Sequence, residues 1–181
     1  MDDANAPVSP DQKALLATLH RRLGIPTDYG RNPFRPPYGE TATLETVGLD
    51  VFGRPVSLAP RGARHWRRLA EAPRGDGIAV ELVSGFRSMA YQAGLIEAKL
   101  ARGQAIEAIL AVNAAPGYSQ HHTGLAVDLT TPGVEPLSEA FAATEAFAWL
   151  SANAHGFGFS MPYGRNNAFG FVYEPWHWGL L

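Results

Sequence analysis

A carboxylate inside an apolar strand is the feature that most constrains this chain. Residues 125–129 read Leu-Ala-Val-Asp-Leu, a run that predicts a short buried β-strand. Because side chains alternate along a strand, the odd-numbered residues would face the core, while Asp128 shares the other face with Gly124 and Ala126. Aspartate is disfavoured in mid-strand, so a ligand role explains Asp128 better than a turn or cap does. Its small neighbours leave room for an ion and a substrate.

Two polar clusters carry the residues that could hold such an ion. The first covers residues 119–128 (Ser-Gln-His-His-Thr-Gly-Leu-Ala-Val-Asp) and the second covers residues 174–178 (Glu-Pro-Trp-His-Trp). The chain has no cysteine, so a metal would have to be bound by histidine and carboxylate side chains. A hydrolytic zinc needs three protein ligands and one open position, and two histidines with one carboxylate suit it.

Strand periodicity does not choose between the adjacent His121 and His122. Counted back from Asp128 along a continuous strand, His122 shares its face and His121 does not, but the intervening glycine weakens that count. Glu174 and His177, three residues apart, would lie on opposite faces of a straight strand unless the proline between them bends the chain. Periodicity therefore leaves the histidine ligands open.

The remaining sequence predicts helices mixed with short strands. Residues 9–24 begin with a Ser-Pro-Asp-Gln capping signal and predict a helix that ends at glycine, and residues 25–43, with four prolines, predict a loop. We expect further helices at 61–72, 88–103, 105–112 and 144–154, a hairpin at 47–58, strands at 78–83 and 125–129, and an extended segment at 173–178. The prediction is an α+β fold: a small, mostly antiparallel sheet flanked by helices in a single domain.

Composition excludes several functional classes. The 15 basic and 17 acidic residues give a formal net charge of -2, so there is no electrostatic footprint for nucleic acid or for an anionic membrane. No stretch is long enough to span a membrane, and the acidic segment Met1–Asn5 does not read as a secretory leader. We expect a monomer that acts on a small neutral or locally charged substrate.

Three segments, taken in order, resemble one protein family. Residues 84–92 match S-G-[FY]-R-S-x-x-x-Q, residues 119–128 match S-x-H-x-x-G-x-A-x-D, and residues 174–178 match E-x-x-H-W. These patterns resemble the zinc D-Ala-D-Ala carboxypeptidases of the VanY type, which are related to the VanX dipeptidases and to Hedgehog-like zinc folds. Three motifs in the right order make a specific signal. The first 75 or so residues match no motif.

The resemblance implies both a fold and a metal. It implies a single domain of the Hedgehog/D-Ala-D-Ala peptidase type, with a zinc peptidase domain at residues 44–181 and residues 1–43 packed on it as a helix and Pro-rich loop. It implies that Zn²⁺ is bound by His121, Asp128 and His177, which selects His121 over His122. It also implies a location in the periplasm or outside the cell.

The resemblance further implies the chemistry, which elementary principles support. Glu174 would be the general base, because a carboxylate that is not itself a ligand can take a proton from a water activated by zinc. Arg87 would stabilise the developing oxyanion with its planar guanidinium. Ser119 and Gln92 would contact the substrate, a peptidoglycan stem peptide with a free carboxylate on a terminal D-residue. No H-E-x-x-H helix is present, which excludes a thermolysin-like template.

Each of these residues also has a structural interpretation. Arg87 could pair with a structural carboxylate, and Ser119 and Gln92 could be cap or turn residues. His122 is expected to support the site from outside the ligand set or to face solvent. The other histidines, His20, His65 and His155, lie in helical or cap contexts and are assigned no role.

Four functions are consistent with these features. The leading one is a D-alanyl-D-alanine carboxypeptidase acting on peptidoglycan stem peptides. A peptidoglycan endopeptidase of the endolysin type, cutting between L-Ala and D-Glu, is the closest alternative, and an L,D-carboxypeptidase is another. A zinc-holding module without hydrolysis would need neither Glu174 nor Arg87, which argues against it.

Overall fold

A computed structural model describes residues 7–181 of the chain, so the segment Met1–Asn5 lies outside the described residues. The helices are α1 (Pro10–Leu23), α2 (Pro60–Glu71), α3 (Met89–Leu100), α4 (Ile106–Leu110) and α5 (Glu145–Asn153). Short 3₁₀ turns are η1 (Tyr29–Arg31), η2 (Ala72–Asp76), η3 (Gln120–Thr123), η4 (Glu139–Ala143) and η5 (Ala154–Phe157). The strands are β1 (Glu45–Leu49), β2 (Pro55–Leu58), β3 (Glu81–Ser84), β4 (Ala126–Thr130), β5 (Phe159–Ser160) and β6 (His177–Leu180).

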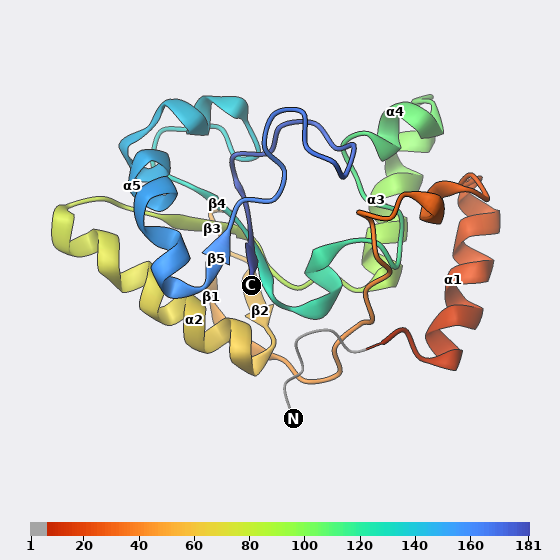
Figure 1. The fold of residues 1–181 in the computed structure, drawn as a ribbon, viewed down its shortest axis with the longest axis horizontal. Helices are drawn as coiled ribbons and strands as arrows, with labels where there is room; N and C mark the ends of the chain where they lie inside the picture. Colours follow the sequence, from red (N-terminus) through yellow and green to blue (C-terminus); the bar gives the residue numbers. More distant parts are fainter. Residues whose placement is uncertain (1–6) are drawn as a thin grey trace.

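The strands form two small antiparallel sheets. The predicted hairpin is β1–β2, and the second sheet has the order β3-β4-β6-β5 with every neighbouring pair antiparallel. Helices α2 and α5 lie on one side of the molecule and α1, α3 and α4 on the other, with the four-stranded sheet on the side of α2 and α5 (Figure 1). The predicted α+β single domain with a small antiparallel sheet is confirmed.

Two hydrophobic cores correspond to these two sides. The larger one packs α2 and α5 against the sheets through residues such as Trp66, Leu69, Leu129, Leu150 and Phe159. The smaller one packs α1 against α3 and α4 through Leu19, Leu23, Met89, Ile96 and Ile109. The first polar cluster, residues 119–128, follows Ala115 of the smaller core in the sequence and leads into Val127 of the larger core.

The N-terminal helix follows from its capping residues. Ser9 and Gln12 form a reciprocal capping box, and Gly24 ends the helix in the left-handed conformation at φ 68°. The loop that follows hydrogen-bonds to the rest of the protein: the Tyr38 N–H donates to the carbonyl of Gly117, and the Thr41 N–H donates to that of His122. Residues 7–43 therefore lie against the remainder of the chain, while the boundary at residue 43 stays a prediction.

Two predicted extended segments are shorter in the structure. The predicted strand at 78–83 begins only at Glu81, because residues 78–80 do not pair with a neighbouring strand. Gly77, just before them, ends the preceding 3₁₀ turn in a left-handed conformation. The predicted extended segment at 173–178 is a turn followed by a strand, since the His177 N–H donates to the carbonyl of Glu174 at 3.1 Å and β6 starts at His177. The bend expected at Pro175 is present.

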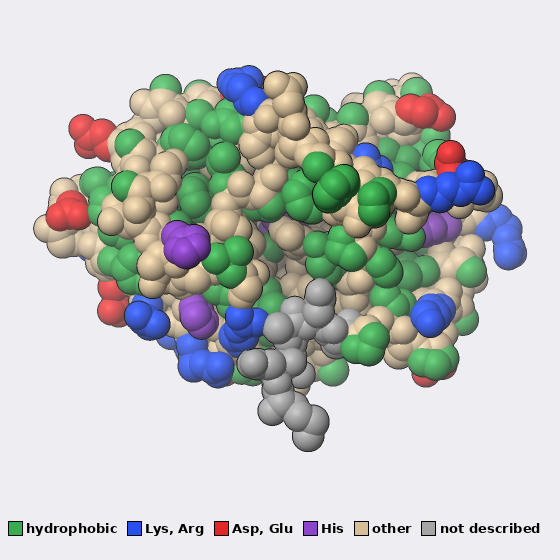
Figure 2. All heavy atoms as spheres, in the orientation of Figure 1, with side chains coloured by type: hydrophobic (Ala, Val, Ile, Leu, Met, Phe, Trp, Pro, Cys, Tyr) green, Lys and Arg blue, Asp and Glu red, His purple; other side chains and the backbone are tan. Residues whose placement is uncertain are grey.

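The charged side chains on one face of the molecule lie mainly around its rim, and the centre is hydrophobic or uncharged (Figure 2). Basic side chains gather over α2, whose exposed positions include Arg64, Arg67 and Arg68. Within residues 7–181, no helix combines the length and the apolar character that crossing a bilayer requires.

Candidate active site

Strand register brings two of the candidate ligands together. Asp128 of β4 is the antiparallel partner of His177 of β6, and directly paired residues project from the same face of a sheet with their Cβ atoms about 4.5–5.5 Å apart. The neighbouring Val127 and Leu129 turn to the opposite face and join the larger core. The alternation predicted from sequence therefore holds for β4, and it directs the Asp128 carboxylate toward His177.

The adjacent histidines diverge because they lie on a 3₁₀ turn and not on a strand. Ser119 caps this turn by accepting a hydrogen bond from the His121 N–H, and Gly124 ends it at φ 65°. A period of two does not apply to such a turn, so the parity count that favoured His122 has no force. His121 projects toward Asp128 and His177, whereas His122 projects away from them.

The three candidate ligand atoms form a nearly equilateral triangle. His121 Nε2 lies 3.3 Å from Asp128 Oδ1 and 3.2 Å from His177 Nδ1, and His177 Nδ1 lies 3.1 Å from the same Asp128 oxygen. Atoms bound to a tetrahedral zinc at about 2.0–2.2 Å are about 3.3–3.6 Å apart. All three side chains are buried. Two nitrogens and one carboxylate oxygen in this arrangement fit three corners of a zinc tetrahedron.

Hydrogen bonds behind the two histidines set their tautomers. The outer nitrogen of His121, Nδ1, lies 2.6 Å from the Gly85 carbonyl, and the outer nitrogen of His177, Nε2, lies 2.8 Å from Gln120 Oε1. A carbonyl oxygen can only accept, so each outer nitrogen carries the proton and each inner nitrogen presents a lone pair. Three electron-rich atoms then face one another at 3.1–3.3 Å, an arrangement that a bound cation stabilises.

The pKa values agree with those protonation states. Burial, together with the charge of Arg87, lowers the pKa of His121 to about 4. Burial alone would raise the pKa of Asp128, but the two histidines and Arg87 lower it well below its usual value. A neutral imidazole and an ionised carboxylate are the forms that bind a metal.

Two further charged residues flank this triad. The Arg87 guanidinium lies 3.5 Å from Asp128 Oδ2, and its buried Nε has no hydrogen-bond partner among the described residues. Glu174 is anchored through its backbone N–H to the carbonyl of Tyr163. Burial, and secondarily the charge of Asp128, raises the pKa of Glu174 to about 8, which Arg87 partly opposes. The Arg87 guanidinium, a hydrogen-bond donor, and the Glu174 carboxylate, a proton acceptor, thus face the same space.

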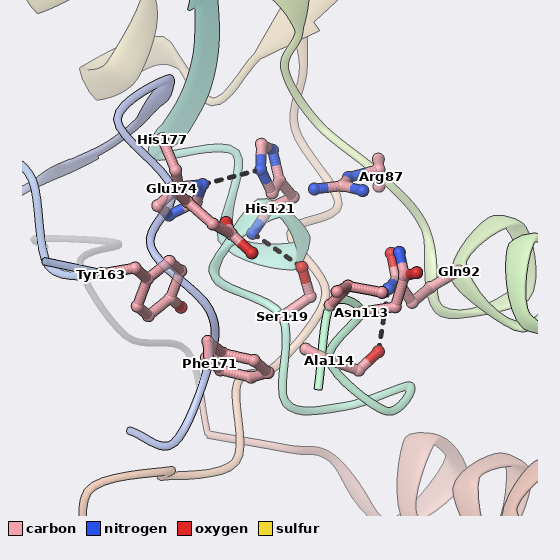
Figure 3. Close-up of a pocket in the computed structure, with 11 residues that line it drawn as sticks. Arg87, Gln92, Asn113, Ala114, Ser119, His121, Tyr163, Phe171, Glu174 and His177 are labelled. Carbon is pink, nitrogen blue, oxygen red and sulfur yellow. Dashed lines mark hydrogen bonds between the residues drawn. The ribbon is translucent and has the colours of Figure 1, made fainter. Parts of the chain in front are cut away.

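That space is a small cavity of about 40 Å³ beside the triad (Figure 3). The sequence-predicted residues His121, His177, Arg87, Glu174, Ser119 and Gln92 all line it, and Asp128 lies behind them. Tyr163, Phe171, Asn113, Ala114 and Val112 complete the wall. Its wall combines aromatic side chains with a few polar groups, a lining that is typical of small-ligand sites.

The two predicted substrate contacts are held by the backbone. Ser119 Oγ accepts from the His121 N–H, so its own hydroxyl proton remains free to be donated. Gln92 donates its amide to the Ala114 carbonyl at 2.8 Å, which turns its Oε1 atom the other way. That oxygen is buried and has no partner within residues 7–181. Ser119 is also a cap, so both of its expected roles are compatible.

Several residues of the site carried no signal in the sequence. Tyr163 stacks on the His177 ring, with ring centroids 4.6 Å apart, and Phe171 packs edge-on against Tyr163. Both come from the irregular segment 161–176, where neither periodicity nor a motif marks them. Gln120 stands at an unspecified position of the second motif, and its contact with His177 crosses 57 residues of sequence.

Of the two alternatives expected for His122, exposure to solvent is wrong, and support of the site from outside the ligand set agrees with its contacts. Its ring is fully buried, with Nε2 accepting from the Gly117 N–H at 3.0 Å and Nδ1 lying 2.6 Å from the Arg87 carbonyl. It connects the turn that carries His121 to the loop that carries Arg87. His20 and His65 each contact a backbone carbonyl away from the triad, and none of the three histidines without an assigned role lines the cavity.

Comparison with known proteins supports this architecture. The chain is 32% identical over 179 residues to a D-alanyl-D-alanine carboxypeptidase of Enterococcus faecalis, which covers 93% of this chain and 59% of the relative. The alignment with a Bacillus subtilis relative covers 58% of that relative. This chain therefore spans less than two thirds of the length of these curated relatives.

Among solved structures, the LdcB LD-carboxypeptidase aligns with a TM-score of 0.71 at 27% identity, covering 80% of this chain and 71% of that one. A vancomycin-resistance D,D-pentapeptidase VanY variant in complex with Zn(II) aligns with a TM-score of 0.61 at 27% identity, covering 77% and 79%. The family model for VanY, D-alanyl-D-alanine carboxypeptidase, matches residues 55–180. The chain therefore belongs to the VanY family of D-alanyl-D-alanine carboxypeptidases.

Proposed function

We propose that this chain is a zinc-dependent D-alanyl-D-alanine carboxypeptidase that acts on peptidoglycan stem peptides outside the cytoplasm. The observation that carries the proposal is the buried triangle of His121 Nε2, His177 Nδ1 and Asp128 Oδ1, with sides of 3.1–3.3 Å and both histidine protons directed outward. The family supports the reaction, and the Zn(II) complex of a VanY relative supports the metal.

When bound, zinc would act as a Lewis acid and would lower the pKa of a water molecule to about 7. Glu174, at the cavity wall, is in place to accept the proton of an attacking water and to return it to the amine that leaves. Its burial makes it a stronger base than an exposed carboxylate. Glu174 is therefore proposed as the general base and acid.

Arg87 is proposed to offset the charge that develops on the peptide carbonyl oxygen. Its guanidinium is held near Asp128, and its backbone is tied to the His121 turn by a hydrogen bond from the Arg87 N–H to the His121 carbonyl at 3.2 Å. The side chain is 18% exposed, so it interacts in a poorly solvated environment where a fixed charge acts strongly.

Ser119 and Gln92 are proposed to bind the terminal residue of the substrate. The free hydroxyl proton of Ser119 can be donated to a carboxylate, and the unpaired Oε1 of Gln92 can accept from a peptide N–H. The peptidase unit is proposed to be residues 44–181, and the described part of the N-terminal unit 1–43, from residue 7 onward, packs on it. The protein is proposed to be a monomer.

L,D-carboxypeptidase activity is the second candidate, favoured by the TM-score of 0.71 to the LdcB enzyme. Both activities release a single terminal D-Ala, and they differ in whether the preceding residue is a D-residue or an L-residue. The choice therefore depends on contacts to the penultimate residue.

The test uses synthetic stem peptides and mass spectrometry with the zinc-loaded protein. A D,D-carboxypeptidase removes one D-Ala from the pentapeptide, an L,D-carboxypeptidase removes D-Ala from the tetrapeptide, and either activity should be lost when the terminal carboxylate is amidated. Cleavage of the amidated pentapeptide inside the stem, at the rate of the free acid, would contradict a carboxypeptidase and would indicate an endopeptidase.

A further inference from the structure

One residue of the cavity wall lies outside all three sequence motifs and has an unusual polar partner. Asn113 follows α4, with its N–H bonded to the Ile109 carbonyl at 2.8 Å, and its half-buried side chain lines the cavity between Ser119 and Gln92 (Figure 3). Its Oδ1 atom lies 2.5 Å from Nζ of Lys99. Lys99 comes from the last turn of α3 and does not line the cavity.

The lysine determines which way the asparagine amide points. An ammonium group has only donors, so it must face the oxygen of the amide and not its nitrogen. The Nδ2 group of Asn113 is then turned away from Lys99, and it makes no hydrogen bond to any other described residue. The two N–H groups of Asn113 Nδ2, on a side chain that lines the cavity, can therefore donate to an acceptor on a bound ligand.

The polar groups around Asn113 match one kind of ligand. Ser119 offers a free hydroxyl proton, Arg87 offers a guanidinium with an unpaired Nε, and Lys99 adds a positive charge behind the amide. Gln92 Oε1 is an unpaired acceptor on the same wall. A terminal amino-acid residue presents a carboxylate that only accepts, beside an N–H that only donates.

We propose that Asn113, oriented by Lys99, donates to the free carboxylate of the terminal substrate residue and so contributes to the discrimination between a free C-terminus and a blocked one. The inference rests on the proposed carboxypeptidase function and deepens it. A neutral donor to a charged acceptor contributes about 10- to 100-fold in affinity. Asn113 touches the substrate in this account, whereas Lys99 is a positioning residue.

The test compares a stem pentapeptide with its C-terminal amide, using the ratio of the two kcat/KM values. Asn113→Ala should lower the preference for the free acid about 10- to 100-fold, mainly by raising KM for the acid, with zinc content and Tm unchanged. Asn113→Asp should lower it further, because two carboxylates would then face each other. Lys99→Met should cause a smaller loss in the same direction, since the amide is no longer oriented.

Lys13 offers a matched control, because it is the other lysine of the chain and lies exposed on α1. Lys13→Met should leave the acid-to-amide ratio at the wild-type value. If Asn113→Ala keeps the wild-type ratio, Asn113 does not bind the carboxylate, although the enzyme remains a carboxypeptidase. If wild type itself does not prefer the free acid, the proposed function fails as well. Should Asn113→Ala not fold, the ratio measured for Lys99→Met decides.

Discussion

Replacing the buried His122 should lower the stability of the protein without removing the metal, whereas the neighbouring His121 is expected to bind the metal. His122→Phe keeps an aromatic ring but removes both ring nitrogens, which leaves the Gly117 N–H and the Arg87 carbonyl without their partners. A buried polar group left unpaired costs about 1–3 kcal/mol. The two losses together predict a decrease of about 2–6 kcal/mol in the free energy of unfolding, a large share of a typical total of about 5–15 kcal/mol.

The assay is urea unfolding followed by tryptophan fluorescence, with EDTA present so that metal binding does not contribute. Zinc content is measured separately on the folded protein by mass spectrometry. His122→Phe should lose stability and still bind one zinc per folded chain, because neither of its ring nitrogens faces the triad. Its kcat should also fall, since the bond that anchors the Arg87 carbonyl is lost.

Two further variants make the result decisive. His121→Ala should lose the zinc, because Nε2 of His121 is one corner of the triangle. His20→Phe removes a single contact, to the Pro116 carbonyl, and should cost about 1 kcal/mol with zinc content unchanged. If His122→Phe loses zinc while keeping the wild-type unfolding midpoint in EDTA, the two histidines have been assigned the wrong way round.

Three other changes test separate parts of the site and the fold. Glu174→Gln should keep the zinc and lower kcat by at least about 100-fold, because it removes the proposed general base; loss of the metal would make Glu174 a ligand. Gln120→Leu removes the acceptor behind His177 and should weaken zinc binding about 10- to 100-fold, as measured by competition with a chelator. Burial alone would raise the pKa of Asp50, but hydrogen bonds from backbone N–H groups and from the guanidinium of Arg54 lower it below 3.8. The stability that this carboxylate contributes is therefore present above about pH 4 and lost as the pH falls through its folded pKa. Asp50→Asn should accordingly destabilise the protein by about 1–2 kcal/mol at pH 7, and equal destabilisation at pH 3 in urea titrations would contradict this sign.

The sequence by itself determined the local features of this protein. A capping box and a glycine predicted α1, and alternation along residues 125–129 predicted that Asp128 turns away from the core. Three motifs in order indicated the family, which the match over residues 55–180 shows. These signals are readable because capping and alternation depend on residues within a few positions of one another.

Only the tertiary structure decided how those residues meet. The register that pairs Asp128 with His177, and the 3₁₀ turn that separates His121 from His122, come from packing across the chain and not from local spacing. Periodicity left the choice between His121 and His122 open, because the alternation of a strand does not apply to the 3₁₀ turn that the chain forms there. The partners that set the tautomers are backbone or side-chain oxygens remote in sequence.

The residues of the cavity wall were the least predictable from the sequence. Asn113, Tyr163 and Phe171 come from irregular segments, so no period or cap predicts where their side chains point. Asn113 is oriented by Lys99, Tyr163 stacks on the His177 ring, and Phe171 packs edge-on against Tyr163. Contacts of that kind join segments that lie far apart in the sequence, so the local preferences of the chain do not predict them.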